Sequence, residues 1–158
     1  MPDKVKKLAS RKKVLAVASS GGHWTQLLRV MPAFDCHEVA FVTVLEAYRS
    51  DVPDHRFYLV DDANRWNKFG LIKLAASVAW IVAKERPDVV VSTGAAPGYF
   101  AVLVGRLLGA KTIWIDSITN IERLSMSGAL AGKHANLWLT QWPHLAKAEG
   151  PQYGGSVL

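Results

Sequence analysis

Apolar runs of strand length alternate with helix-length patterns along nearly the whole chain, and this alternation restricts the possible folds more than any other feature. It is typical of a parallel sheet, because each crossover between parallel strands needs a connection long enough for a helix. The pattern therefore predicts an α/β fold with helices on both faces of the sheet. The predicted strands cover residues 13–18, 39–44, 57–60, 88–92, 111–115 and 137–140, the last of which closes the sheet. The predicted helices cover residues 24–31, 67–84, a segment that ends near 109, and 125–133.

Length and charge predict one domain preceded by a basic tail. The chain has 158 residues, 50% hydrophobic and 20% charged, which fits a single compact core. We place the domain at 13–158 and the tail at 1–12. The formal net charge is +6, and much of the excess lies at Lys4, Lys6, Lys7, Arg11, Lys12 and Lys13. Charge concentrated in a tail favours an anionic membrane surface over a nucleic-acid groove, so we predict no nucleic-acid partner.

Cysteine content and apolar run length bear on the compartment. The single cysteine, Cys36, cannot form an internal disulfide, which fits a reducing compartment. The longest apolar stretch, 71–83, is interrupted by Lys73 and Ser77 and is shorter than the roughly 20 residues that cross a bilayer. The histidines and Cys36 lack the spacing of metal ligands. We therefore expect a peripheral protein at the cytoplasmic face of a membrane, with no metal or cofactor.

The first candidate site follows the first predicted strand. Ser20, Gly21, Gly22 and His23 lead into a predicted helix, where glycine lets the backbone approach a ligand and the helix end attracts an anion. A phosphate fits such a turn, and the imidazole of His23 can act as a base toward a hydroxyl or donate to a phosphate. The alternative is a tight turn that uses glycine for its shape, with His23 as a capping or exposed side chain.

Two further strand ends supply small or polar residues. Thr93 and Gly94 lie in the small-residue loop 92–98, and loops after parallel strands gather at the carboxyl edge of the sheet, where ligands bind. Asp116 and Ser117 also follow a strand, and a carboxylate there can orient a sugar hydroxyl. The alternatives are an ordinary tight turn at 92–98 and a turn- or helix-capping role for Asp116.

The predicted helix 67–84 has two interpretations. Apolar residues wrap most of it, so the more common arrangement is a helix packed in the core. Trp66, Lys68, Phe69 and Lys73 instead fit a surface that rests on lipid headgroups, which agrees with the basic tail. Both interpretations stay open at this point.

Ordered motifs along the chain carry a family resemblance. They lie at 19–23, 92–94, 116–117, 124–128, 139–143 and 153–158. With these motifs in this order, the chain resembles the Alg14 family and its bacterial relatives of the PssD type, over nearly the whole chain from Lys13 onward. The resemblance implies a Rossmann-like domain equivalent to the N-terminal domain of a GT-B glycosyltransferase, similar to the enzyme that adds N-acetylglucosamine in peptidoglycan precursor synthesis.

The resemblance also implies an activity. The chain would be one subunit of an inverting, metal-free hexosyltransferase that moves GlcNAc, GlcA or Gal from a UDP-sugar to a polyprenyl-pyrophosphate-linked saccharide. An Alg13-like or PssE-like partner would bind the donor, so the chain alone is expected to be inactive. His23 and Asp116 are then the candidate catalytic residues, with His23 as base or phosphate contact. The candidate substrate- and phosphate-binding residues are Ser20, Gly21, Gly22, Thr93, Gly94 and Ser117.

Partner docking is expected at two segments near the end of the chain. Its candidate residues are Gln141, Trp142, Pro143, Val157 and Leu158, with ordinary exposed loops as the alternative. A different class of function is a non-catalytic recruiter that tethers a competent transferase to the membrane. A nucleotide-binding oxidoreductase domain is disfavoured, because the first turn lacks the complete dinucleotide glycine pattern.

Overall fold

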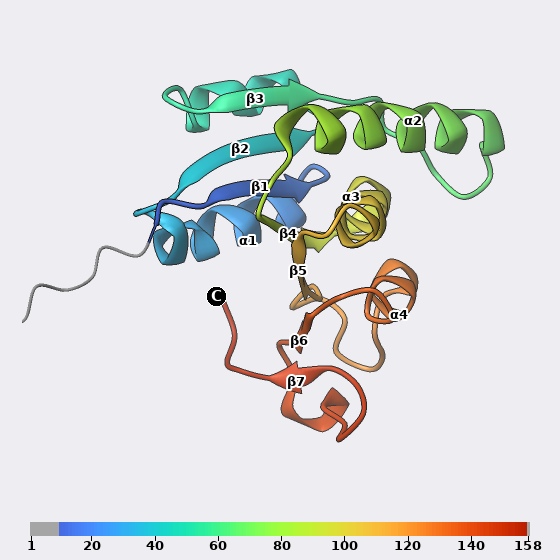
Figure 1. Ribbon diagram of the computed structural model, residues 1–158. Helices are drawn as coiled ribbons and strands as arrows, with labels where there is room; N and C mark the ends of the chain where they lie inside the picture. Colours follow the sequence, from blue (N-terminus) through green and yellow to red (C-terminus); the bar gives the residue numbers. More distant parts are fainter. Residues whose placement is uncertain (1–9, 158) are drawn as a thin grey trace, which may run out of the picture.

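The computed structural model describes residues 10–157 and contains one seven-stranded sheet in which every paired strand is parallel (Figure 1). Along the sheet the order is β3-β2-β1-β4-β5-β6-β7. The strands are β1 (Lys13–Ala18), β2 (Glu38–Thr43), β3 (Arg56–Leu59), β4 (Val89–Gly94), β5 (Lys111–Ile115), β6 (Leu137–Thr140) and β7 (Gln152–Tyr153). The predicted α/β, Rossmann-like fold is confirmed.

Helices cover both faces of this sheet. They are α1 (Gly22–Val30), α2 (Lys68–Glu85), α3 (Ala95–Leu107) and α4 (Met126–Ala131), with short 3₁₀ helices η1 (Met31–Phe34), η2 (Glu46–Asp51) and η3 (Pro143–Leu145). The buried side chains form two clusters, one that includes residues of α1 and one that includes residues of α2, α3 and α4. Figure 1 shows α1 on the side of β1 that faces away from α2 and α3.

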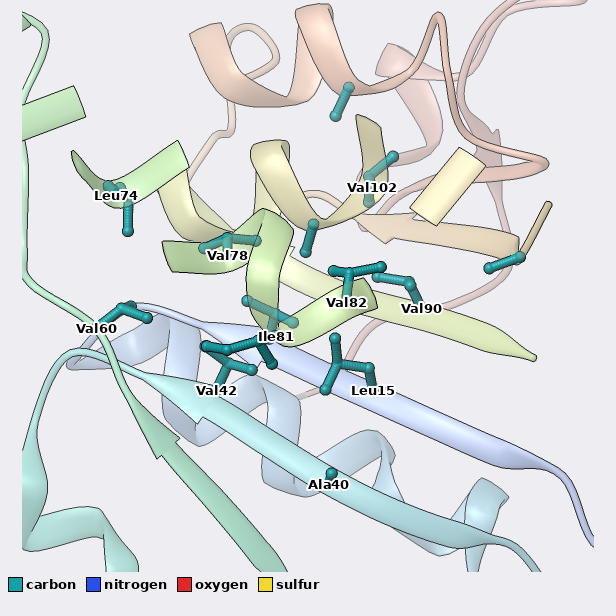
Figure 2. Close-up of a cluster of buried hydrophobic side chains, with 14 of the residues drawn as sticks. Leu15, Ala40, Val42, Val60, Leu74, Val78, Ile81, Val82, Val90 and Val102 are labelled. Carbon is teal, nitrogen blue, oxygen red and sulfur yellow. The ribbon is translucent and has the colours of Figure 1, made fainter. Parts of the chain in front are cut away.

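The two clusters follow from the alternation of side chains along each strand. In β1, Leu15 and Val17 belong to the cluster of α2, α3 and α4, whereas Val14 and Ala16 belong to the cluster of α1. A strand buried on both faces must be apolar at every position, which is why these strands read as continuous apolar runs. Figure 2 shows Val82 and other α2 side chains beside those of β1 and β2.

Helix α2 begins and ends where its sequence predicts. The side chain of Asn67 caps the first turn by accepting a hydrogen bond from Gly70 N at 2.9 Å. At the other end, Arg86 adopts a left-handed conformation with φ of 47°, and Pro87 follows it. The prediction of a helix at 67–84 is therefore confirmed to within one residue at each end.

The sheet extends one strand beyond the sequence prediction, which ended it at 137–140. After η3 the chain turns back and β7 pairs with β6, with Leu139 opposite Gln152 and Thr140 opposite Tyr153. Two residues are too few to give a periodic pattern, so this strand is defined by its pairing alone. Of the predicted basic tail, residues 1–9 lie outside the described part of the chain.

Candidate active site

The carboxyl edge of the sheet has a switch point between β1 and β4. The chain leaves β1 through α1 toward β2, whereas β4 lies on the other side of β1 and continues through α3 toward β5. The connections after β1 and β4 therefore diverge, and such a divergence leaves the crevice in which open α/β sheets bind ligands. Ser20, Gly21 and Gly22 are exposed at this edge, directly before His23.

His23 is joined to the connection after β4 by two hydrogen bonds. Its Nδ1 lies 3.1 Å from the carbonyl oxygen of Thr93, and the hydroxyl of Thr93 donates to the carbonyl oxygen of His23 at 2.6 Å. A carbonyl oxygen can only accept, so Nδ1 must carry the proton. In the neutral ring this tautomer leaves Nε2 with an unshared electron pair, which is the state that a general base needs.

Gly94 makes this close approach possible. A Cβ added at Gly94 would lie 2.2 Å from Nδ1 of His23, and the residue has φ of 148°, a conformation that residues with side chains rarely adopt. The next residue, Ala95, has φ of 67° despite its Cβ, which strains the start of α3. The sequence predicted Thr93 and Gly94 as ligand-binding residues. The structure gives both of them a part in holding His23.

The glycine turn before α1 is held in place by neighbouring side chains. Gly21 N donates to the hydroxyl of Tyr48 at 2.8 Å, and the Tyr48 ring stacks on Trp24 with 4.8 Å between ring centres. Trp24 is itself held by a hydrogen bond from Nε1 to Asp51 at 2.8 Å. The sequence prediction missed Tyr48, because it lies in η2 and reaches the turn only through the fold.

Two helix N-termini face this edge without a side-chain cap. The N-cap residues, Gly21 before α1 and Gly94 before α3, have no side chain to accept from the first turn, although their own N–H groups donate to Tyr48 Oη and Ser92 Oγ. Uncapped first turns retain free backbone N–H groups and carry the positive end of the helix dipole. Together they provide the kind of environment that binds phosphate groups.

Asp116 has different surroundings from those of His23. It is 1% exposed, and its carboxylate accepts from Trp114 Nε1 (3.2 Å), Ser125 Oγ (2.6 Å), Ser125 N (2.9 Å) and Asn120 Nδ2 (3.2 Å). These bonds fix the connection between β5 and α4, where the Ser125 side chain also caps α4. Every described hydrogen bond of the carboxylate is to a group of the chain itself, as the capping alternative predicts, and the catalytic role stays a prediction.

Ser117, predicted to bind substrate, is 4% exposed and bonded within the chain. Its hydroxyl oxygen accepts from Gln26 Nε2 at 3.2 Å, and Gln26 also accepts from Ile118 N at 3.1 Å. The sequence prediction missed Gln26. The sequence did indicate that Gln26 is buried, because it lies between the apolar residues Trp24 and Leu27 on one short helix and so falls on the buried side.

The expected docking residues divide into buried and exposed members. Gln141 is 3% exposed and bonded internally, so docking through its side chain would require that amide to leave the interior. Trp142 is half-buried and donates from Nε1 to Ile118 O at 2.7 Å, and Pro143 is exposed. Val157 is half-buried, and Leu158 lies outside the described residues.

One face of helix α2 confirms the core-packed interpretation of its sequence, whereas the lipid-headgroup interpretation of the other face stays a prediction. Leu74 and Val78 are 0% exposed in the core, whereas Phe69 is 88%, Ile72 67% and Trp80 60% exposed along the outer face. A contiguous row of exposed apolar side chains is uncommon on a monomer and indicates a surface that meets another apolar phase or partner. In the part of the chain that the structure describes, no helix is long and apolar enough to cross a membrane.

A groove of about 450 Å³ lies beside the start of α3, between the first turn of α2 and α4. Its lining is mostly apolar and includes Leu71, Tyr99, Phe100, Met126 and Leu130, with Arg65 as its one charged side chain. Because Ala95 and Ala96 also line it, the groove begins beside the loop that holds His23. An apolar chain attached to a charged head therefore fits this side of the edge.

A cavity of about 700 Å³ lies at the opposite, amino edge of the sheet. Lys12, Arg86 and Lys111 line it, beside the C-terminal ends of α2 and α3. Basic side chains at helix C-termini offset the negative end of the helix dipole, which explains their position without a ligand. Among residues 10–157, no three or more His, Cys, Asp or Glu side chains are placed to share a metal ion, and the expectation of metal-free chemistry stays a prediction.

Comparison with known families identifies the chain's relatives. The model of the family described as "Oligosaccharide biosynthesis protein Alg14 like" matches residues 60–157, which is more than half of the chain. The chain belongs to the Alg14 family. The matched region includes β4, β5 and their connections but begins after the glycine turn and His23.

Individual Alg14 proteins match over a longer region. The "UDP-N-acetylglucosamine transferase subunit ALG14" of Yarrowia lipolytica is 26% identical over 180 aligned residues, covering 94% of this chain and 82% of the relative. The protein of the same name from Homo sapiens is 24% identical, covering 84% of this chain and 76% of the relative. These alignments are long enough to extend the family relationship toward the N-terminal part of the domain.

A solved structure shares the fold of this Alg14-family chain. MurG of Acinetobacter baumannii superimposes with a TM-score of 0.72 at 19% sequence identity, over 87% of this chain. The match covers only 43% of the MurG chain, so the Alg14-family chain spans less than half of MurG. The predicted GT-B-type domain is thereby confirmed at the level of the fold.

Proposed function

We propose that this Alg14-family chain is the acceptor-side subunit of a two-component inverting glycosyltransferase. The reaction would transfer a sugar from a UDP-sugar to a saccharide linked to a lipid through pyrophosphate. The observation that carries the proposal is the meeting of His23 with Thr93 and Gly94 at the β1/β4 switch point. The names of the Yarrowia lipolytica and human relatives, both UDP-N-acetylglucosamine transferase subunits, favour N-acetylglucosamine as the sugar.

His23 would act as the general base. Inverting transfer needs a group that accepts the proton of the attacking hydroxyl as the bond to the anomeric carbon forms. With Nδ1 committed to the Thr93 carbonyl, Nε2 of the neutral ring is the atom available for that proton. The bond to Thr93 also stabilises the imidazolium that results, because the carbonyl dipole keeps its negative end toward the ring.

The uncapped N-termini of α1 and α3 would bind phosphate oxygens beside His23. Their backbone N–H groups and dipoles favour negative charge, and the N-terminus of each helix directly adjoins the His23–Thr93 contact. This arrangement supports binding of the acceptor pyrophosphate, with the saccharide hydroxyl presented to Nε2. The exposed turn at Ser20, Gly21 and Gly22 lets the ligand approach the backbone closely.

A separate donor-binding subunit would complete the cleft. The match covers 43% of the MurG chain, and the carboxyl edge described here would supply a base and phosphate contacts for one side of a cleft. Half a cleft gives only part of the charge stabilisation and alignment that the transfer requires. The Alg13-like or PssE-like type of subunit is the partner proposed here.

The outer face of α2 would rest on the membrane that holds the acceptor lipid. Its exposed aromatic side chains, Phe69 and Trp80, are of the type found at lipid headgroups, and Lys84 lies 4.8 Å from the centre of the Trp80 ring. The apolar groove lined by Leu71 of α2 and by Ala95 lies beside the loop that holds His23. The proposed location is the cytoplasmic face.

Reconstitution tests the proposal. Transfer from radiolabelled UDP-GlcNAc, UDP-GlcA and UDP-Gal to a polyprenyl-pyrophosphate-linked saccharide is measured with this chain, with its donor-binding partner, and with both. Transfer that requires both proteins would support the two-component enzyme and identify the donor. Equal transfer by the partner alone would reduce this chain to a recruiter, the alternative function.

A further inference from the structure

Two buried glutamines join parts of the chain that are far apart in sequence. Gln26 lies in α1 and Gln141 directly follows β6, and each is 3% exposed. Their side chains meet, because Gln141 Nε2 donates to Gln26 Oε1 at 2.5 Å. Buried amides are costly unless their donors and acceptors are paired, so a paired set holds its surroundings in one arrangement.

The side chain of Gln26 also forms hydrogen bonds with the connection that follows β5. Its Nε2 donates to Ser117 Oγ at 3.2 Å, and its Oε1 accepts from Ile118 N at 3.1 Å. Gln26 comes three residues after His23 in α1, so the two side chains lie about one helical turn apart on neighbouring parts of the helix surface. The position of α1, and with it His23, is therefore tied to the connection after β5.

The side chain of Gln141 also forms hydrogen bonds with two other segments. Its Nε2 also donates to Asp116 O at 3.0 Å, and its Oε1 accepts from Val157 N at 2.8 Å. Arg29, in the last turn of α1, donates to Val157 O at 3.2 Å. The C-terminal segment at 154–157 is thus attached both to Gln141 and to α1.

We propose that Gln26 and Gln141 are positioning residues that couple the C-terminal segment to the His23 edge. When Val157 is seated on Gln141, the Gln141 amide is oriented toward Gln26, and Gln26 is oriented toward Ser117 and Ile118. Loosening either end of this chain of hydrogen bonds loosens the other, because each buried amide can satisfy its groups in only one arrangement. A partner that contacts the C-terminal segment would thereby influence the residues that face the acceptor.

The first test measures amide hydrogen exchange in the full chain by NMR. Gln26→Leu removes no atom bonded to Val157, so an effect there must pass through Gln141 or through Arg29, which lies in the same helix. We expect the amides of Ile118 and Val157 both to exchange about tenfold faster than in the unsubstituted chain. Faster exchange at Ile118 with unchanged exchange at Val157 would overturn the coupling.

A second variant tests the coupling from the other end and avoids the interior. Arg29 is exposed, so Arg29→Ala removes its bond to Val157 with little risk to folding. Reciprocal coupling requires Ile118 to exchange faster in this variant as well, although Arg29 makes no described hydrogen bond to that residue. Ile118 exchange equal to that of the unsubstituted chain would contradict the proposal. Thr25→Ala is the matched control, because Thr25 is exposed in the same helix, its hydroxyl bonds to Gly21 O and to neither glutamine, and its loss should leave exchange at Ile118 and Val157 unchanged.

The consequence for catalysis rests on the proposed function. In the reconstituted pair, Gln26→Leu should lower kcat about tenfold or more while the KM for the UDP-sugar stays the same, since the donor is bound by the partner. An unchanged kcat would show that the coupling does not reach the reacting groups. If the unsubstituted pair transfers no sugar, the proposed function fails, whereas the exchange measurements still decide the coupling.

Discussion

His23 and Asp116 both follow a strand at the same edge of the sheet, but their surroundings differ. His23 is half-buried, and its described hydrogen bond to the chain uses Nδ1. Asp116 is 1% exposed, and each of its carboxylate oxygens accepts two hydrogen bonds. The comparison teaches that the position of a polar side chain at the carboxyl edge does not by itself show whether the fold leaves one of its atoms available to a ligand.

A glycine packs against each of these two side chains. A Cβ at Gly94 would lie 2.2 Å from His23 Nδ1, and a Cβ at Gly128 would lie 2.2 Å from Asp116 Oδ1. Both contacts therefore depend on the absence of a side chain opposite. Substitutions at and around the two sites can separate the contribution of each contact to folding stability from its contribution to sugar transfer.

The largest effect is expected for Gly94→Ala, which combines the clash at His23 with an unfavourable φ of 148°. We expect the free energy of unfolding to fall by about 3 kcal/mol. Transfer by the reconstituted pair should fall by about 100-fold or more, because His23 is displaced from Thr93. Urea denaturation and the transfer assay measure the two effects.

Gly109→Ala is the matched control for this substitution. Gly109 also has a positive φ, 88°, but a Cβ there would have no atom within 4 Å. It should cost about 1 kcal/mol of stability and leave transfer unchanged. Equal behaviour of the two variants would show that the contact between Gly94 and His23 has no importance of its own.

Asp116→Ala should mainly affect stability. The substitution leaves the donors of Trp114, Asn120 and Ser125 without their buried acceptor, and we expect the free energy of unfolding to fall by about 3 kcal/mol. Denaturation curves and kcat, measured where the variant is still folded, separate the two roles. A variant as stable as the unsubstituted chain but without transfer would support the predicted catalytic role of Asp116.

Ala95→Gly tests the backbone strain beside the contact between His23 and Gly94. Ala95 has φ of 67°, which costs a residue with a Cβ about 1–3 kcal/mol, whereas glycine adopts it freely. Part of that gain is lost because glycine is more flexible in the unfolded chain, so stability should rise by about 1 kcal/mol. Thermal denaturation measures the change. A loss of stability would show that the Ala95 methyl group contributes packing that outweighs its strain.

The smallest effect is expected for a buried carboxylate with charged partners, Glu85. Burial raises the pKa of Glu85, but hydrogen bonds from Arg56 and Tyr58 outweigh it and hold the pKa below its usual range. A pKa lowered by folding stabilises the protein above the unfolded value of about 4.3 and stops doing so as the pH falls through the folded value. Unfolding free energies from pH 7 to pH 3 should therefore decline at the acidic end.

Glu85→Gln should flatten that acidic decline, because glutamine does not titrate in this range. Some decline will remain, since the pKa of Glu38 is also lowered, chiefly by its hydrogen bond with Arg56. An unaltered pH dependence in Glu85→Gln would assign the acid sensitivity to other carboxylates. The substitution also contrasts two buried carboxylates, because Glu85 is bonded to a charged arginine whereas the donors bonded to Asp116 are neutral.

The sequence alone predicted the fold well, because strand and helix patterns are local. Apolar runs located β1 to β6, and Asn67 and Pro87 marked the limits of α2. The strand β7 escaped prediction because its two residues are ordered by pairing with β6 rather than by their own pattern.

The site was less predictable, because its roles depend on contacts between distant residues. Turn chemistry indicated His23, but the tautomer follows from a carbonyl 70 residues away. The capping alternative for Asp116 could not be chosen without Ser125 and α4 in place. Gln26 and Gln141 are 115 residues apart, and neither forms part of a pattern that reveals their contact.

The most direct test of the account is kcat of the reconstituted pair with His23→Ala. The side chain is half-buried, so the melting temperature should stay within about 3 °C of the unsubstituted chain. The account predicts that kcat falls by about 100-fold to 10,000-fold while the complex with the partner still forms. A kcat within about threefold of the unsubstituted pair would contradict it, because loss of a general base costs far more, and would leave this chain as a recruiter.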